Sequence, residues 1–233
     1  MELILAIDSS SVVASVAIVS EDKVIAEYST NLKKTHSQTL MPMIDEIFKM
    51  TGLDKKDLKA VAITNGPGSF TGLRIGGATA KGIALALNIP VIQISTIEAM
   101  AYNINYTDKY ICPIMDARRN QVYTGVYECK EEEINCIVNP KACDIKELID
   151  ELEKTGNEVI FLGDGIVPFK DIIDKEMKLK HYFSKGHLNS QRAGTIGVLA
   201  WKYFLEEKYV SSEEFSLEYF RLSQAERERM NRG

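Results

Sequence analysis

The stretch LILAIDSSSVVASVAIVSEDKVIAEYS, residues 3–29, predicts three β-strands joined by short polar connections. The first apolar run ends at Asp8, and the next two runs are rich in alanine and β-branched side chains. The connections at residues 9–11 and 21–23 are too short for the crossover that parallel strands need. The chain therefore opens with an antiparallel meander. Its three strands are expected at residues 3–7, 12–19 and 24–29.

Hydrophobic periodicity predicts that a similar order of elements occurs twice. After the meander we expect helices at residues 35–50, 71–87 and 96–102, and strands at 60–64 and 90–94. Beyond a polar junction we expect strands at 110–115, 121–127, 131–138 and 158–162, and helices at 144–152 and 189–205. Asp116 then matches Asp8 as the acid that ends a first strand. The GDG turn at 163–165 matches the GPG turn at 66–68.

A duplicated α/β unit that opens with a meander is typical of the actin-like and sugar-kinase-like ATPase fold. In that fold two ribonuclease-H-like lobes face each other across a nucleotide cleft. We expect an N-terminal lobe at residues 1–103 and a C-terminal lobe with a charged tail at 104–233. The last long helix is able to pack back on the N-terminal lobe. The fold class alone does not decide the chemistry.

Composition is that of an ordinary globular protein, with 45% hydrophobic and 26% charged residues among 233. The net charge of −5 argues against independent, tight binding of nucleic acid. The four cysteines form no C-x-x-C pair, so a zinc site is not predicted. No basic leader and no apolar run of the roughly 20 residues that a membrane span needs is present, which predicts a cytoplasmic protein without a membrane partner.

The glycine-rich loop GPGSFTGLRIG, residues 66–76, fails both common nucleotide motifs. A Walker loop needs lysine after its last glycine, but Leu73 follows Gly72. A Rossmann loop needs a third glycine where Thr71 stands. Two interpretations remain. Backbone N–H groups at residues 69–72 could attract an anion, or the loop is a tight turn that needs positive φ, and local composition favours the turn.

The helix behind this loop carries three interior glycines, and each costs about 1 kcal/mol relative to alanine. Such a cost indicates that another backbone approaches closely. Together with the preceding helix, this helix is predicted to form a protein–protein interface over residues 40–50 and 73–87. The alternative is that both helices are buried within the monomer. The interface residues are expected to be Leu40, Met43, Ile47, Leu73, Arg74, Gly76, Gly77, Ala80, Lys81 and Ala84. Gly77→Arg or Ala80→Glu is then expected to block association.

Few residues are candidates for chemistry. Asp8, Ser9 and Asp116 are weak candidates for contacts to a magnesium nucleotide in the cleft, because the long phosphate hairpin of active kinases is missing after Asp8. Arg118 and Arg119 could hold an anion or a partner's carboxylate, or could lie at a solvated strand end. No catalytic residue and no metal site is predicted. The histidines His36, His181 and His187 include no helical pair that could bind a metal.

Five motifs, in order along the chain, resemble the TsaB family. They are LAIDSSS at 5–11, HSQTLMPMI at 36–44, TNGPGSFTGLRIG at 64–76, MDARRNQVY at 115–123 and YFRLSQAERE at 219–228. The resemblance implies a non-catalytic subunit that pairs with the catalytic paralogue TsaD and the ATPase TsaE. That complex transfers a threonylcarbamoyl group to the tRNA adenosine next to the anticodon. The chain would form a homodimer when alone, would meet tRNA only through the complex, and would have no cofactor of its own, with ATP or ADP bound within the complex.

A second function class stays open from the residues themselves. The chain could be an autonomous enzyme of the same fold, either a phosphotransferase or a metallopeptidase. The missing histidine pair, which TsaD carries as H-x-x-x-H, argues against a metallopeptidase. The short turn after Asp8 argues against a phosphotransferase.

Overall fold

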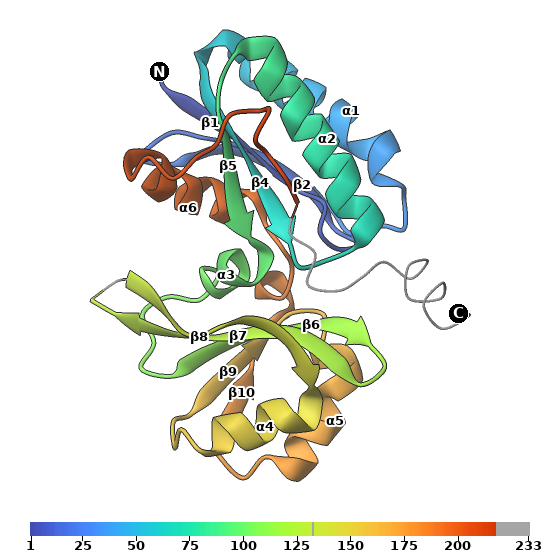
Figure 1. The fold of residues 1–233 in the computed structure, drawn as a ribbon, viewed down its shortest axis with the longest axis vertical. Helices are drawn as coiled ribbons and strands as arrows, with labels where there is room; N and C mark the ends of the chain where they lie inside the picture. The colour runs from blue at the N-terminus through green and yellow to red at the C-terminus, as the bar shows by residue number, and fades with distance from the viewer. Residues whose placement is uncertain (132, 218–233) are drawn as a thin grey trace.

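The computed structural model describes residues 1–131 and 133–217, and these form two five-stranded sheets (Figure 1). The first sheet contains β1 (Leu3–Asp8), β2 (Ala14–Val19), β3 (Val24–Thr30), β4 (Leu58–Gly66) and β5 (Val91–Ser95). The second contains β6 (Tyr110–Arg118), β7 (Gln121–Lys130), β8 (Glu133–Asp144), β9 (Val159–Leu162) and β10 (His181–Phe183).

Both sheets have the same topology. Their strand orders are β3-β2-β1-β4-β5 and β8-β7-β6-β9-β10. In each sheet the first three strands are antiparallel neighbours, the fourth pairs parallel with the first, and the fifth pairs parallel with the fourth. The duplication is therefore confirmed, with Asp8 as the last residue of β1 and Asp116 two residues before the end of β6. The protein has the actin-like, sugar-kinase-like ATPase fold of two ribonuclease-H-like lobes that the sequence predicts.

Helices cover both faces of the first sheet (Figure 1). Helices α1 (His36–Thr51) and α2 (Phe70–Leu87) pack on one face, and α6 (Ala193–Leu205) packs on the other. The central strand β1 is consequently buried throughout, which explains its continuous apolar run. Leu3, Leu5 and Ile7 join the core beneath α1 and α2, and Ile4 and Ala6 join the core beneath α6.

The remaining helices belong to the second sheet and to the junction. Helix α3 (Thr96–Ala101) lies between the two sheets, whereas α4 (Ile145–Glu153) and α5 (Ile166–Glu176) pack together on the second sheet. Single 3₁₀ turns occur at η1 (Lys55–Asp57) and η2 (Gly186–Leu188). No helix in the described part of the chain is long and apolar enough to cross a membrane.

The structure differs from the sequence predictions mainly in the second lobe. The sequence placed no element between residues 166 and 188, where α5 and β10 lie. Strand β8 runs six residues beyond the expected end at residue 138, through Pro140, because an edge strand tolerates a proline on its open side. Helix α6 begins at Ala193 rather than at residue 189. The division of the chain at residue 103 stays a prediction.

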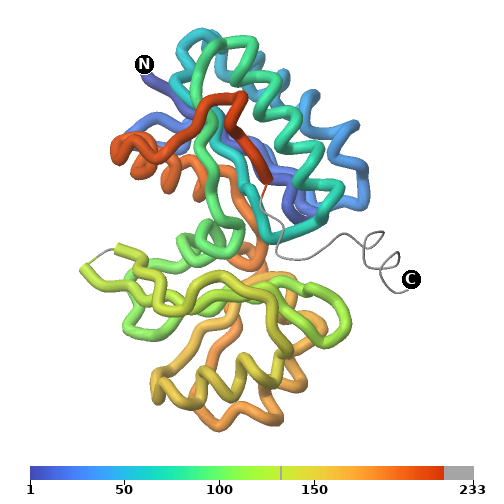
Figure 2. Tube along the Cα trace, viewed as in Figure 1, coloured from blue at the N-terminus to red at the C-terminus, as the bar shows by residue number. Residues whose placement is uncertain are grey.

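After α6 the chain returns along the first lobe, as the red end of the trace in Figure 2 shows. Val210 pairs with Val91, and the two backbone hydrogen bonds between them are 2.9 and 3.0 Å long. Phe215 is buried in the core beneath α1 and α2, and Leu217 packs against that core. We call residues 209–217 the C-terminal strap. It covers the open edge of β5 and part of α2.

Candidate functional site

Asp8 ends β1 with its carboxyl group fully buried. Its Oδ1 accepts hydrogen bonds from the Ser10 backbone N–H and from Ser10 Oγ, each 3.0 Å long. Burial raises the pKa of Asp8 to about 6, and the bonds from Ser10 oppose that rise. Asp8 thus holds the turn at residues 9–11 in place from beneath.

The glycine-rich loop packs directly against this serine turn. The Ser69 N–H donates to Ser10 O at 2.6 Å, and Ser9 Oγ donates to Gly72 O at 2.9 Å. A Cβ atom at Gly68 would lie 2.3 Å from Ser10 O, and one at Gly72 would lie 2.0 Å from Ser9 O. The close approach that these glycines permit is therefore to the chain's own backbone.

Between the lobes lies a cleft of about 360 Å³. The first lobe lines it with residues 10–12, Gly68 and Ser69, and the second with residues 115–118, Tyr123 and Asp164. Asp164 Oδ1 accepts a 3.2 Å hydrogen bond from the Asp116 N–H. Burial, together with the charge of Asp116, raises the pKa of Asp164.

The three predicted cleft candidates do not share one position. Asp116 lines the cleft, where it pairs with Arg118 at 3.3 Å, whereas Asp8 and Ser9 are fully buried behind the cleft wall. Sequence reasoning missed Asp164, although it noted the GDG turn as the match of GPG. The sequence signal that could have identified Asp164 was an acidic residue in the turn after the fourth strand of the second sheet. In the described part of the chain, no group of three or more His, Cys, Asp or Glu side chains is arranged to hold a metal ion.

Two of the three histidines have structural contacts instead. His36 Nε2 lies 2.8 Å from Ser11 O, and the ring fills the space in front of Gly72. His181 Nε2 lies 3.0 Å from the Asp174 carboxylate. His187 belongs to the 3₁₀ turn η2 on the surface.

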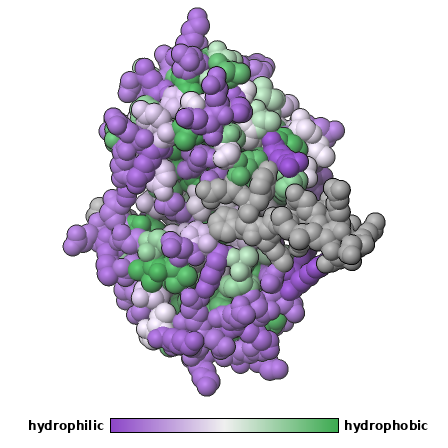
Figure 3. Space-filling view, in the orientation of Figure 1, coloured by the Kyte–Doolittle hydropathy of each residue, from purple (hydrophilic) through white to green (hydrophobic). Residues whose placement is uncertain are grey.

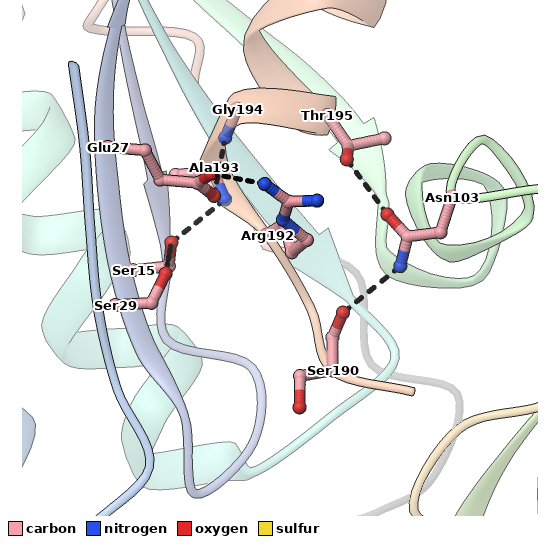
Figure 4. A network of polar contacts seen from close by, with 9 residues as sticks. All are labelled: Ser15, Glu27, Ser29, Asn103, Ser190, Arg192, Ala193, Gly194 and Thr195. Carbon is pink, nitrogen blue, oxygen red and sulfur yellow. Dashed lines mark hydrogen bonds and ion pairs between the residues drawn. The ribbon is translucent and has the colours of Figure 1, made fainter. Parts of the chain in front are cut away.

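The chain passes between the lobes twice, once between α3 and β6 and once between β10 and α6. Hydrogen bonds join these two crossings behind the cleft (Figure 4). Asn103 Nδ2 donates to Leu188 O at 3.1 Å and to Ser190 O at 3.0 Å, and Asn103 Oδ1 accepts from Thr195 Oγ1 at 2.8 Å. Next to it, Glu27 of β3 accepts the Gly194 N–H and pairs with Arg192 at 2.8 Å. One side chain therefore links the outgoing crossing, the returning crossing and the start of α6.

The predicted interface residues on α1 and α2 mostly face inward. Arg74 is exposed and Met43 and Lys81 are half-buried. Seven others are buried within the chain: Leu40, Ile47, Leu73, Gly76, Gly77, Ala80 and Ala84. Two of the three interior glycines are explained by internal contacts, because a Cβ at Gly76 would lie 2.1 Å from Ser9 Oγ and one at Gly77 would lie 3.1 Å from Phe215. Gly77→Arg and Ala80→Glu would therefore disturb the core, and neither tests an interface.

A different set of side chains on these helices points outward. We define the outer helical face as Met41, Met50, Ala78, Gly82 and Leu85, all of which are exposed. The exposed fractions of the three large side chains are 52% for Met41, 67% for Met50 and 61% for Leu85. Nothing lies within 4 Å of a Cβ built at Gly82. Hydrophobic and near-neutral surface follows α2 in the space-filling view (Figure 3).

Comparison with known proteins identifies the family. A family model described as TsaD, tRNA N6-adenosine threonylcarbamoyltransferase, matches residues 23–228. The tRNA threonylcarbamoyladenosine biosynthesis protein TsaB of Bacillus subtilis (strain 168) is 34% identical over 223 residues, which cover 96% of both chains. The chain belongs to the TsaB family. The Escherichia coli (strain K12) TsaB is 31% identical over 228 residues, with 94% of each chain covered.

Solved structures agree with this assignment at the level of the fold. The TsaB-family chain superposes on YeaZ from Pseudomonas aeruginosa with a TM-score of 0.76 at 22% identity, covering 94% of this chain and 100% of that one. A second Pseudomonas aeruginosa protein, described as similar to peptidase YEAZ, gives a TM-score of 0.81 at 23% identity, with 95% and 100% coverage. The function of this TsaB-family chain lies in the biosynthesis of threonylcarbamoyladenosine in tRNA.

Proposed function

We propose that this TsaB-family chain is a non-catalytic, cytoplasmic subunit that binds a TsaD-like paralogue through its outer helical face. The single observation that carries the proposal is the exposure of Leu85 on the same face of α2 as the small residues Ala78 and Gly82, with Met41 and Met50 exposed on the neighbouring helix α1. Small residues let a partner backbone come close, and methionine adapts to a partner's shape. The same face would pair two copies of the chain when TsaD is absent.

The packing of the serine turn supports a role without phosphoryl transfer. In kinases of this fold, the turn after the first strand holds phosphate. Here residues 9–11 are packed on the glycine loop by the bonds from Ser69 and to Gly72. ATP or ADP, and a TsaE-like ATPase, would then act in the assembled complex, and tRNA would reach the chain only there.

The test is association with purified TsaD, measured by size-exclusion chromatography and calorimetry. Gly82→Arg is expected to weaken binding at least 100-fold, because a charged side chain would be buried in the contact. Gly186→Arg is the matched control, since Gly186 is also exposed and has open space around it on the second lobe. Unchanged binding of Gly82→Arg would overturn the assignment of the face. ATP turnover by the isolated chain would overturn the non-catalytic role.

A further inference from the structure

One mouth of the cleft carries exposed cations, although the whole chain has a net charge of −5. Lys33 and Lys34 lie in the connection between β3 and α1, and Arg118 and Arg119 lie in the hairpin between β6 and β7. We call these four residues the basic rim. In Figure 1 the blue connection and the green hairpin lie on the same side of the cleft, one on each lobe.

The two lysines are held beside the cleft wall of the first lobe. Their connection, residues 31–35, is anchored at both ends: Thr30 pairs with Ala14 in the sheet, and the His36 ring binds Ser11 O. Ser11 itself lines the cleft. All five residues of the connection are exposed. Five residues span at most about 18 Å when fully extended, so both lysines lie within one short loop of the cleft wall.

The two arginines are held at the mouth from the second lobe. Arg118 pairs with Gln121, so Arg119 and Asn120 form a two-residue turn with φ values of 57° and 60°. Arg118 also has a positive φ, of 66°. Such turns favour glycine or asparagine at both central positions. An arginine that keeps this unfavourable conformation on a fully solvated tip points to a use for its side chain outside the chain.

Of the four rim residues, one is paired with a described acid at this mouth. Asp116 pairs with Arg118, and Asp164 lies deeper and binds the Asp116 backbone. Lys33, Lys34 and Arg119 form no ion pair with any residue in the described ranges. The chain as a whole is negative, so these unpaired cations form a local positive region at the cleft mouth, and such a region favours a polyanion.

We propose that the basic rim contacts phosphate groups of tRNA when the chain is part of its complex. The proposal rests on the proposed function, which places the chain in a tRNA-modifying assembly. Lysine and arginine side chains bind backbone phosphates, and an exposed arginine fork can bind one phosphate through two hydrogen bonds. The net negative charge explains why such a surface would add to RNA binding by a partner and would not hold RNA alone.

The test uses the complex with TsaD and unmodified tRNA. The triple variant Lys33→Gln/Lys34→Gln/Arg119→Gln is compared with Lys23→Gln/Lys56→Gln/Lys175→Gln, which removes three exposed charges that are also unpaired within the described chain. The tRNA dissociation constant is measured at several salt concentrations. For the rim variant we expect at least tenfold weaker binding, and a slope of log K against log salt that is smaller by about two to three. The control is expected to keep both values.

The outcomes separate the two proposals. An intact complex in which the rim variant binds tRNA with unchanged affinity and salt dependence overturns the rim proposal alone. A wild-type chain that fails to associate with TsaD counts against the proposed function instead. If the rim variant loses TsaD or TsaE and keeps tRNA affinity, the rim binds acidic protein side chains, and the tRNA assignment is wrong.

Discussion

Asp8 is a carboxyl group with no exposed surface, and its pKa is raised to about 6 because burial penalises the charged form. The ordinary value in an unfolded chain is 3.8. Between these two values the folded protein binds the proton more tightly than the unfolded chain does. The free energy of unfolding therefore falls as the pH rises from about 4 to about 6. The shift of about two pKa units corresponds to about 3 kcal/mol.

Replacing this group with a neutral one tests that account. Asp8→Asn keeps an oxygen that can accept the Ser10 bonds and removes the titration. We expect the variant to gain up to about 3 kcal/mol of stability relative to the wild type as the pH rises from 4 to 6.5. Urea unfolding at a series of pH values measures the difference. Curves that stay parallel across that range would show that Asp8 does not titrate there.

The sequence predicted the cleft residues only in part, because it shows the order of residues along the chain but not how deeply each one is buried. Asp8 and Asp116 were matched correctly as acids at or near the ends of β1 and β6. Nothing in their pattern indicates that Asp8 is covered by its own serine turn while Asp116 stays at the cleft surface. Asp164 was missed because the GDG turn was interpreted through its glycines.

At the scale of the element, α2 has two faces that respond differently to the same substitution. At Gly72 a Cβ would lie 2.0 Å from the Ser9 carbonyl oxygen, so Gly72→Ala must displace backbone and should cost about 2–3 kcal/mol. At Gly82 the space is open, and Gly82→Ala should stabilise the helix by about 1 kcal/mol. Thermal and urea unfolding of the two variants compare them directly. Equal changes in stability for the two variants would contradict the close packing of α2 on the serine turn.

Helix α2 also shows why the sequence alone did not separate its buried residues from its exposed ones. A helix that is apolar on all sides needs cover on all sides, and sequence alone cannot say whether the cover is a partner or the chain itself. Here the C-terminal strap supplies it, with Phe215 and Leu217 over Gly77. The strap is more than 120 residues away in sequence, and its residues show no periodic pattern. In contrast, the meander and the two long helices of the first lobe were predictable from local periodicity.

At the scale of the whole molecule, we expect the angle between the lobes to depend on Asn103. Its amide joins both crossings through the carbonyl oxygens of residues 188 and 190. Asn103→Asp removes the two donors and leaves the acceptor for Thr195 in place, so the crossings lose their tie. We expect a broader distribution of lobe separations.

Spin labels at Val12 and Val167 measure that distribution, because both are exposed and lie on different lobes. The measurement uses a Cys136→Ser background, since Cys136 is exposed. Asn105→Asp is the control, because Asn105 is exposed two residues further along the junction. If the distance distribution of Asn103→Asp is as narrow as that of the control, other contacts between the lobes fix their angle.

The return of the chain to its first lobe has a consequence for synthesis on the ribosome. Residues 110–183 contain every strand of the second sheet, and they emerge before α6 and the C-terminal strap. The first sheet begins at Leu3 but lacks cover on one face until residue 205 has been made, and lacks its edge cover until residue 217. The lobe that is translated first is thus the last to be completed, and until then the apolar face that α6 covers stays open to water and to other chains.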